Sequence, residues 1–390
     1  MRIALVTDGV YPFVVGGMQR HSAYLTRYLT RQGAQVILVH CATHGQLPSK
    51  EEVIDALGID HPENLEIITL RFPSFGKLPG HYLRESLVYS EMALKALNEH
   101  LASLDLIYAK GLSGWMMAEK RRKRLLNVPL AVKFHGYEMY QTIPGWRNRF
   151  ARMLLRGPVK FINQNADWVF SYGGKITEII TNQLGVLPDK VLEIPTGIAE
   201  EWIADNVPLA SGLRRLVFVG RYERRKGVEE LSAAIQDLLR SHEFAFDFIG
   251  PVPFNERIKH PNVHYHGQLT DTNEIKAILD TAQVLVTPSH AEGMPNVILE
   301  GMSRGLAVIA TDVGAISAMV DSSNGWLIEA NNATDLKTAI RESLTIQPER
   351  LEAMQQRSIQ RAMEQFTWSA VAHQTLNVLR QISHQDAAQH

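Results

Sequence analysis

The sequence predicts an α/β protein with two domains, each a doubly wound parallel sheet, facing each other across a cleft. The chain has 390 residues, which exceeds what one hydrophobic core usually organises, because domains typically hold about 100–200 residues. Short apolar, β-branched segments alternate with longer amphipathic ones along the whole chain, a pattern typical of parallel strands joined by crossover helices. A cleft is expected because open parallel sheets bind ligands beyond the carboxyl ends of their strands.

Seven strands are predicted in the first half of the chain, at Ile3–Thr7, Gln35–His40, Leu65–Leu70, Leu106–Ala109, Leu130–Phe134, Trp168–Tyr172 and Val191–Ile194. A polar stretch from Glu200 to Arg215, with Pro208 and Gly212 inside it, interrupts the series. The second half is predicted to hold strands at Leu216–Gly220, Phe246–Ile249, Val263–Tyr265, Val284–Thr287, Ala307–Thr311 and Trp326–Ile328. We therefore assign residues 1–197 to the first domain and begin the second at residue 198.

The composition indicates a folded globular protein with no overall charge. Hydrophobic residues make up 45% of the chain, and 40 basic side chains stand against 41 acidic ones, so we expect no nucleic-acid partner. Cys41 is the only cysteine, which excludes an intramolecular disulfide and favours a reducing compartment. Met1–Asp8 resembles a first buried strand more than a secretory signal, and no segment approaches ~20 apolar residues. We therefore expect a cytoplasmic protein with at most peripheral membrane contact.

The most informative segment is Ser289–Gly301, which follows a predicted strand and has the pattern of a tight loop that leads into a helix. Pro295 suits a first helical turn, Gly293 permits close approach of a ligand, and the free amides beyond them form a phosphate site. Glu292 in the loop and Glu300 in the helix can face one cleft at different depths, where carboxylates accept hydrogen bonds from sugar hydroxyls. The alternative is that both glutamates are solvated surface groups.

A basic turn follows another strand, at Val219–Gly227. Arg221 and Lys226 can converge on one pyrophosphate and neutralise the charge that grows on a leaving diphosphate. Arg224 and Arg225 are interpreted as solvated groups of the same turn.

Two loops of the first domain add candidate residues. Gly16 and Gly17 follow the first strand, where paired glycines let main-chain amides meet an anion, although a plain turn is an equally good interpretation. His135 and Glu138 follow the strand at Leu130–Phe134, and the carboxyl end of a strand faces the cleft. A lone histidine is more often structural.

Together these segments resemble the GT-B retaining glycosyltransferases with two Rossmann-like domains, particularly family 4. The resemblance runs the full length of the chain, with supporting matches at Pro195–Ile198, Thr311–Gly314 and Phe366–Trp368. It implies that residues 366–390 form a terminal helix that crosses back to the first domain, which limits the second domain to 198–365. Departures from the family pattern are Gln19, where an acidic residue often stands, and Thr196, where asparagine is common.

The resemblance implies a role for each candidate. Glu292 would hold donor-sugar hydroxyls and Glu300 the ribose, while His135 would orient the sugar and stabilise charge at the reacting centre. Glu138 would support His135 or touch the acceptor. The remaining donor-binding candidates, which would contact the diphosphate or the sugar, are Gly16, Gly17, Arg221, Lys226, Gly293, Met294, Pro295 and Asn296.

The expected activity is retaining transfer of a sugar from a nucleoside diphosphate sugar to a hydroxyl acceptor. The acceptor would be a saccharide or a lipid-linked saccharide in cell-envelope polysaccharide or lipopolysaccharide synthesis. No Asp-X-Asp metal motif is present, so neither a metal nor a cofactor is expected, and cationic side chains with helix amides would neutralise the diphosphate. The alternatives are a catalytically silent sugar-nucleotide or membrane-surface binding module and a sugar-nucleotide phosphorylase or epimerase. An oxidoreductase is disfavoured because the first strand lacks a Gly-X-Gly-X-X-Gly turn.

A local basic bias lies between Lys120 and Lys160, where eleven basic residues accompany one acidic residue, Glu138. An amphipathic helix in this stretch could lie on an anionic lipid surface. Equally, its apolar arc could pack into the domain core and leave the basic stripe solvated. The residues assigned to the membrane surface are Arg147, Arg149, Arg152, Arg156 and Lys160.

Overall fold

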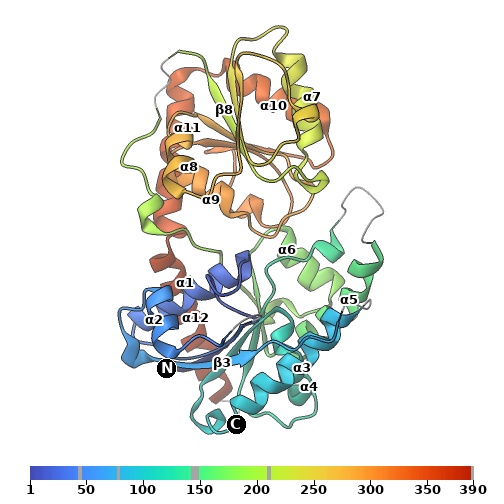
Figure 1. The fold of residues 1–390 in the computed structure, drawn as a ribbon, viewed down its shortest axis with the longest axis vertical. Coiled ribbons are helices and arrows are strands. Elements are labelled where there is room, and N and C mark those ends of the chain that lie inside the picture. The colour runs from blue at the N-terminus through green and yellow to red at the C-terminus, as the bar shows by residue number, and fades with distance from the viewer. Residues whose placement is uncertain (43–45, 77–79, 142–148, 209–211, 388–390) are drawn as a thin grey trace.

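Two parallel sheets, one above the other, organise the computed structural model of the chain (Figure 1). The structure describes residues 1–42, 46–76, 80–141, 149–208 and 212–387, and within these it leaves the side chains of 149–152 and 384–387 undescribed. The first sheet has the order β3-β2-β1-β4-β5-β6-β7 and the second the order β10-β9-β8-β11-β12-β13. The predicted fold class, two doubly wound parallel-sheet domains, is confirmed.

The first sheet consists of β1 (Arg2–Val6), β2 (Gln35–Ala42), β3 (Leu65–Arg71), β4 (Leu106–Lys110), β5 (Leu130–Lys133), β6 (Trp168–Ser171) and β7 (Val191–Glu193). The second consists of β8 (Arg215–Val219), β9 (Ala245–Ile249), β10 (Val263–Gly267), β11 (Val284–Thr287), β12 (Ala307–Thr311) and β13 (Gly325–Ile328). Each predicted strand is present, and the ends differ by no more than two residues. The central strands are buried on both faces, which is why their sequences are continuous apolar runs.

Helices cover both faces of each sheet. Those of the first domain are α1 (Gly17–Arg31), α2 (Lys50–Leu57), α3 (His81–Ala96), α4 (Trp115–Arg122), α5 (Arg149–Asn165) and α6 (Lys175–Glu178). The later ones are α7 (Val228–Leu238), α8 (Thr272–Leu279), α9 (Asn296–Ser303), α10 (Ala333–Thr345), α11 (Pro348–Gln365) and α12 (Trp368–Ala387). Within the described part of the chain, no helix is both long enough and apolar enough to cross a membrane.

The chain crosses between the domains twice, and the two crossings lie side by side. The amide of Ile198 donates to the carbonyl of Phe366 (2.7 Å), and the amide of Trp368 donates back to Ile198 (3.0 Å). From there α12 runs down the first domain and packs on α1 (Figure 1). Trp368 is buried, and its ring stacks on Tyr24 with centroids 5.3 Å apart. The last helix is thus part of the first domain's core.

Candidate active site

The two domains meet where the loop after β11 contacts the loop after β5. Gly293 lies so close to the first domain that a Cβ on it would stand 2.0 Å from the carbonyl oxygen of His135. Gln141 of the first domain pairs with the main chain of Glu292: its Nε2 donates to the carbonyl (2.7 Å) and its Oε1 accepts from the amide (3.1 Å). Two motifs separated by more than 150 positions in the sequence are therefore brought to one place.

The side chain of Glu292 is buried and held by groups of its own domain. Lys226 Nζ donates to Oε1 at 2.6 Å, Ser289 Oγ donates to the same oxygen at 2.8 Å, and Arg225 Nη1 donates to Oε2 at 3.1 Å. Charge-assisted bonds of this kind fix the orientation of a carboxylate. The Glu292 carboxylate is therefore held in one orientation beside the loop of His135.

The basic turn after β8 is arranged differently from the prediction. The side chain of Arg221 is 70% exposed and pairs with Glu223 (2.9 Å), so Arg221 and Lys226 hold different carboxylates. The interpretation of Arg225 as a solvated group is wrong, because its side chain is only 24% exposed and contacts Glu292. Arg224 remains exposed, as expected, and its Nη1 donates to Glu230 (2.7 Å).

Gly227 gives this turn its shape. Its φ is +69°, and a Cβ there would stand 2.0 Å from the carbonyl oxygen of Pro288. Glycine alone tolerates both conditions. The turn can therefore pack against the loop of residues 288–292 and deliver Lys226 and Arg225 to Glu292.

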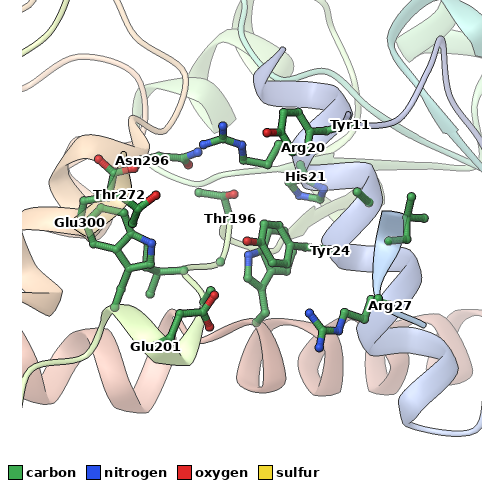
Figure 2. A pocket seen from close by; sticks show the side chains of 18 of the residues that line it. Tyr11, Arg20, His21, Tyr24, Arg27, Thr196, Glu201, Thr272, Asn296 and Glu300 are labelled. Atoms are coloured by element: carbon green, nitrogen blue, oxygen red, sulfur yellow. The ribbon is translucent and has the colours of Figure 1, made fainter. Parts of the chain in front are cut away.

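Glu300 faces a different space from Glu292. It lines a cavity of about 380 Å³ between α1 and α9, called here the α1–α9 cavity, and Glu292 is not among the described residues that line it. Figure 2 shows Glu300 and Asn296 on one side of this cavity and Arg20 and His21 on the other. Burial raises the pKa of Glu300 to about 7, and the nearby charge of Arg20 opposes the rise. The sequence predicts that Glu292 and Glu300 face one cleft, but of these two described residues only Glu300 lines this cavity.

The glycine pair lies at the start of α1. A Cβ on Gly16 would stand 2.1 Å from Gln19 Oε1, while one on Gly17 would meet nothing within 4 Å. Gln19 in turn donates to Asp8 Oδ1 at 2.8 Å. A side chain at residue 16 would displace only the flexible amide end of Gln19, and no neighbouring atom in the structure requires Gly17.

His135 lies among buried basic and aromatic side chains. Its Nδ1 is 2.6 Å from the hydroxyl of Tyr172, and its ring meets that of His21 edge to face at 4.8 Å. Burial lowers the pKa of His135 well below its usual range, and the nearby Lys110 and Lys133 lower it further. The imidazole is therefore neutral. Its Nε2 is buried and has no hydrogen-bond partner among the described residues.

Glu138 lies beside His135 but does not bond to it. Its carboxylate folds over Gly136, where a Cβ would stand 2.7 Å from Oε1. The structure thus brings Glu138 to the same loop, on the first domain's side of the contact with Gly293.

Sequence reasoning missed several groups that the structure places in the site. Gln141 and Arg225 contact Glu292 only because separate segments dock together, so local sequence carries no signal for them. Ser289 lies inside the predicted motif and could have been found as a hydroxyl three residues before Glu292. In the portion of the chain that is described, no three or more His, Cys, Asp or Glu side chains gather as a metal site would require.

The basic helix α5 is only partly described. Arg147 lies outside the described residues, as do the side chains of Arg149 and Arg152, while Arg156 and Lys160 are exposed. Arg156 Nε donates to the carbonyl of Met139 at 2.7 Å, which ties this part of the helix to the loop after His135.

The apolar residues of α5 are divided between two faces. Val159 and Ile162 are buried in the domain core, whereas Met153 is 58% exposed and Leu154 is 37% exposed. Of the predicted apolar arc, Met153 and Leu154 therefore face solvent beside the basic residues, while Val159 and Ile162 anchor the helix in the core.

These features define a class: a glycosyltransferase of the GT-B fold, with a buried glutamate in a glycine loop that faces a histidine of the opposite domain. The family model described as Glycosyltransferase Family 4 matches residues 15–202, and the one described as Glycosyl transferases group 1 matches residues 214–345. The chain belongs to family 4 of the glycosyltransferases.

One relative of the chain is also named as a glycosyltransferase, and two solved structures share the fold. The chain is 33% identical over 141 residues to a putative teichuronic acid biosynthesis glycosyltransferase, TuaC of Bacillus subtilis, a match that covers 36% of each protein. It superposes on sucrose-phosphate synthase from Thermosynechococcus elongatus with a TM-score of 0.73 and 23% identity, covering 98% of both chains. It also superposes on Anabaena HepE in complex with UDP and glucose, with a TM-score of 0.65 and 16% identity, covering 98% of this chain and 100% of that one.

Proposed function

We propose that this protein transfers a glycosyl group from a nucleoside diphosphate sugar to a hydroxyl acceptor, with retention at the anomeric carbon. The observation that carries the proposal is the buried Glu292 carboxylate, oriented by Lys226, Arg225 and Ser289 beside the loop of His135. A glycosyltransferase needs such an acceptor for sugar hydroxyls, placed against the domain that receives the second substrate.

In the proposed complex the donor sugar lies between the loops of the two domains. Glu292 accepts hydrogen bonds from its hydroxyls, and the neutral His135 orients it from the opposite side, with Glu138 next to the acceptor. The main chain of Gly293, Met294, Pro295 and Asn296 contacts the sugar and the phosphate nearest to it. These positions follow the roles that the family resemblance implies.

The second task of the site is to stabilise the negative charge that develops on the leaving diphosphate. The donor's C1–oxygen bond breaks as the acceptor oxygen bonds to C1 from the same face, and the acceptor's proton passes to the departing diphosphate. Arg221, which leaves its exposed ion pair with Glu223, and Lys226 neutralise the diphosphate together with the N-terminal amides of α9. The glycine pair Gly16–Gly17 approaches the diphosphate from the first domain. We propose that this protein charge takes the place of a metal ion, and that no cofactor takes part.

The donor is inferred to be a nucleoside diphosphate sugar, with its ribose on Glu300 in the α1–α9 cavity. The similar fold of HepE holds UDP and glucose, which supports this class of donor. The name of TuaC refers to teichuronic acid biosynthesis, which supports an acceptor among cell-envelope saccharides, free or lipid-linked, at the cytoplasmic face of the membrane.

A thermal-shift screen with UDP-glucose, UDP-galactose, GDP-mannose and ADP-glucose tests the donor class. At a concentration a hundred times Kd, a ligand that binds only the folded state stabilises it by about 2.7 kcal/mol, so at least one donor should raise the melting temperature by several degrees. Lys226→Met should abolish that shift, whereas Lys337→Met on α10, far from the site, should retain it. A flat response to the whole panel would overturn the proposal.

Peripheral membrane docking is a second proposal, favoured by Met153 and Leu154, which are exposed beside Arg156 and Lys160 on α5. Apolar side chains enter the acyl boundary while basic ones attract anionic headgroups, each worth about 1 kcal/mol. The protein should sediment with phosphatidylglycerol vesicles at low salt, and Met153→Asp should weaken this. Equal recovery with phosphatidylcholine vesicles, or none with either, would exclude the idea.

The catalytically silent binding module remains the competing function. Both proteins would bind donors, but only an enzyme releases nucleoside diphosphate. Slow donor hydrolysis without an acceptor, lost in Glu292→Ala, separates the two.

A further inference from the structure

Two lysines end neighbouring strands of the first sheet and are completely buried. Lys110 is the last residue of β4 and Lys133 the last residue of β5, and they are register partners. Their side chains therefore leave the same face of the sheet, about 5 Å apart. Both are 0% exposed. Buried lysines normally pair with a carboxylate, yet among the described residues no acid contributes to the environment of either amine.

The partners of these amines are neutral groups. Lys110 Nζ lies 3.0 Å from His21 Nδ1 and 4.7 Å from the ring centroid of Tyr108. Lys133 Nζ donates to the carbonyl of Ile194 at 2.8 Å and lies 4.1 Å from the ring centroid of Tyr172. Among the residues that the structure describes, no anionic group balances either amine.

Two histidines complete what we call the lysine–histidine cluster, formed by His21, Lys110, Lys133 and His135. Lys110 and Tyr172 each contact an Nδ1 atom, so each imidazole has only its Nε2 left for a further partner. His21 Nε2 and His135 Nε2 are both buried. The cluster therefore holds two buried ring nitrogens that have no hydrogen-bond partner among the described residues.

The pKa shifts of the cluster also indicate that it lacks a balancing anion within the described part of the chain. Burial lowers the pKa of all four groups well below their usual ranges, and repulsion from the other members of the cluster lowers the pKa values of His21, Lys110 and His135 further. The phenols of Tyr108 and Tyr172, which face the lysines, have raised pKa values and stay neutral. An anion beside the cluster would favour its charged forms, because opposite charge acts strongly in a buried environment.

His21 is the member of the cluster that lines the α1–α9 cavity. Arg20, Thr196 and Asn296, the first residue of α9, line the same cavity, together with the acidic residues Asp55, Glu201 and Glu300. Figure 2 shows the guanidinium of Arg20 extending toward Asn296, with His21 next to Arg20 on the same helix. A guanidinium, a helix N-terminus and a buried imidazole with an unpartnered nitrogen form a polar end suited to a phosphate group.

We propose that the lysine–histidine cluster takes up a proton when the diphosphate of a nucleotide sugar binds in the α1–α9 cavity, with His21 facing the anion. This inference rests on the proposed function, because it takes the ligand to be a nucleotide sugar. The proton adds positive charge behind the diphosphate before transfer begins, and that charge stabilises the leaving group as the bond to the sugar breaks. His21, Lys110 and Lys133 act as positioning residues that work through charge.

The sign of the pH dependence follows from linkage. Binding raises the proton affinity of the cluster, so the bound state holds more protons than the free state. Affinity is therefore highest at low pH and falls as pH rises, by about tenfold per pH unit where one proton is taken up.

Calorimetric titration in buffers of different ionisation enthalpy measures this uptake directly. The probe is whichever of UDP-glucose, GDP-mannose and ADP-glucose binds, since a nucleotide sugar has no phosphate that titrates near pH 7. The full chain should take up about one proton per nucleotide between pH 7 and 8.5. His21→Gln and Lys110→Met should each remove most of this uptake and flatten the dependence of affinity on pH.

His40→Gln is the matched control. His40 is also a buried histidine of the first domain, with its Nε2 3.0 Å from Thr69 Oγ1, and its pKa is lowered to about 4. Its replacement should leave proton uptake unchanged, whatever it costs in stability. Binding without uptake in the wild type, or undiminished uptake in both variants, would overturn the inference and leave the proposed function intact. Failure of every nucleotide sugar to bind would contradict the proposed function and the inference with it.

Discussion

Replacing Gly293 by alanine should slow transfer about a hundredfold with little loss of stability. The added Cβ would stand 2.0 Å from the carbonyl oxygen of His135, whereas real contacts of this kind are at least 3.0 Å long. A main-chain carbonyl cannot rotate away as a flexible side chain can, so the two loops must separate by roughly 1 Å. A misplacement of that size costs about 10²-fold in rate.

The assay compares kcat/KM and melting temperature for Gly293→Ala and a control, Gly157→Ala. Gly157 lies within α5, where a Cβ would meet nothing within 4 Å, so this variant should keep full activity and gain up to ~1 kcal/mol of helix stability. Wild-type kcat/KM in Gly293→Ala would refute the claim that the two loops form one reaction centre.

Three further predictions concern pH, redox chemistry and packing. Because burial raises the pKa of Glu300 from its ordinary 4.5 to about 7, the stability that the protonated carboxyl contributes is complete below pH 4.5 and is lost as pH rises through 7; the melting temperature of the wild type should fall between pH 5 and 8 relative to that of Glu300→Gln, and parallel curves would contradict this. Burial also raises the pKa of the Cys41 thiol well above its usual range, so a thiol reagent at pH 8 should label it only as fast as the protein unfolds; rapid labelling of the native protein would show otherwise. Trp368→Ala should cost about 3–5 kcal/mol in urea unfolding, because its buried ring stacks on Tyr24; a loss under 1 kcal/mol would show that α12 is not part of the first domain's core.

The sequence was sufficient to predict the positions of the strands and of the loops that follow them. Buried parallel strands are continuous apolar runs, and their ends differ from prediction by one or two residues where pairing extends past the apolar segment, as in β2 (Gln35–Ala42). The segment around Glu292 was recognisable because its glycine, proline and glutamates are consecutive in the chain.

Contacts between segments that are distant in the chain could not be predicted from the sequence. Arg224, Arg225 and Lys226 are successive residues of one tight turn and project in different directions, so only the packed loop decides that Arg225 reaches Glu292 while Arg224 stays exposed. Lys110 and Lys133 each end an apolar strand, but their burial depends on α1 and α12 covering that end of the sheet.

The central claim is that the oriented carboxylate of Glu292 holds the donor sugar during transfer. The most direct measurement is the single-turnover rate of Glu292→Gln with a donor that stabilises the wild type, beside the exposed control Glu349→Gln on α11. The glutamine variant should bind the donor yet transfer its sugar at least about a hundredfold more slowly, while the control keeps the wild-type rate. An undiminished rate in Glu292→Gln would contradict the account.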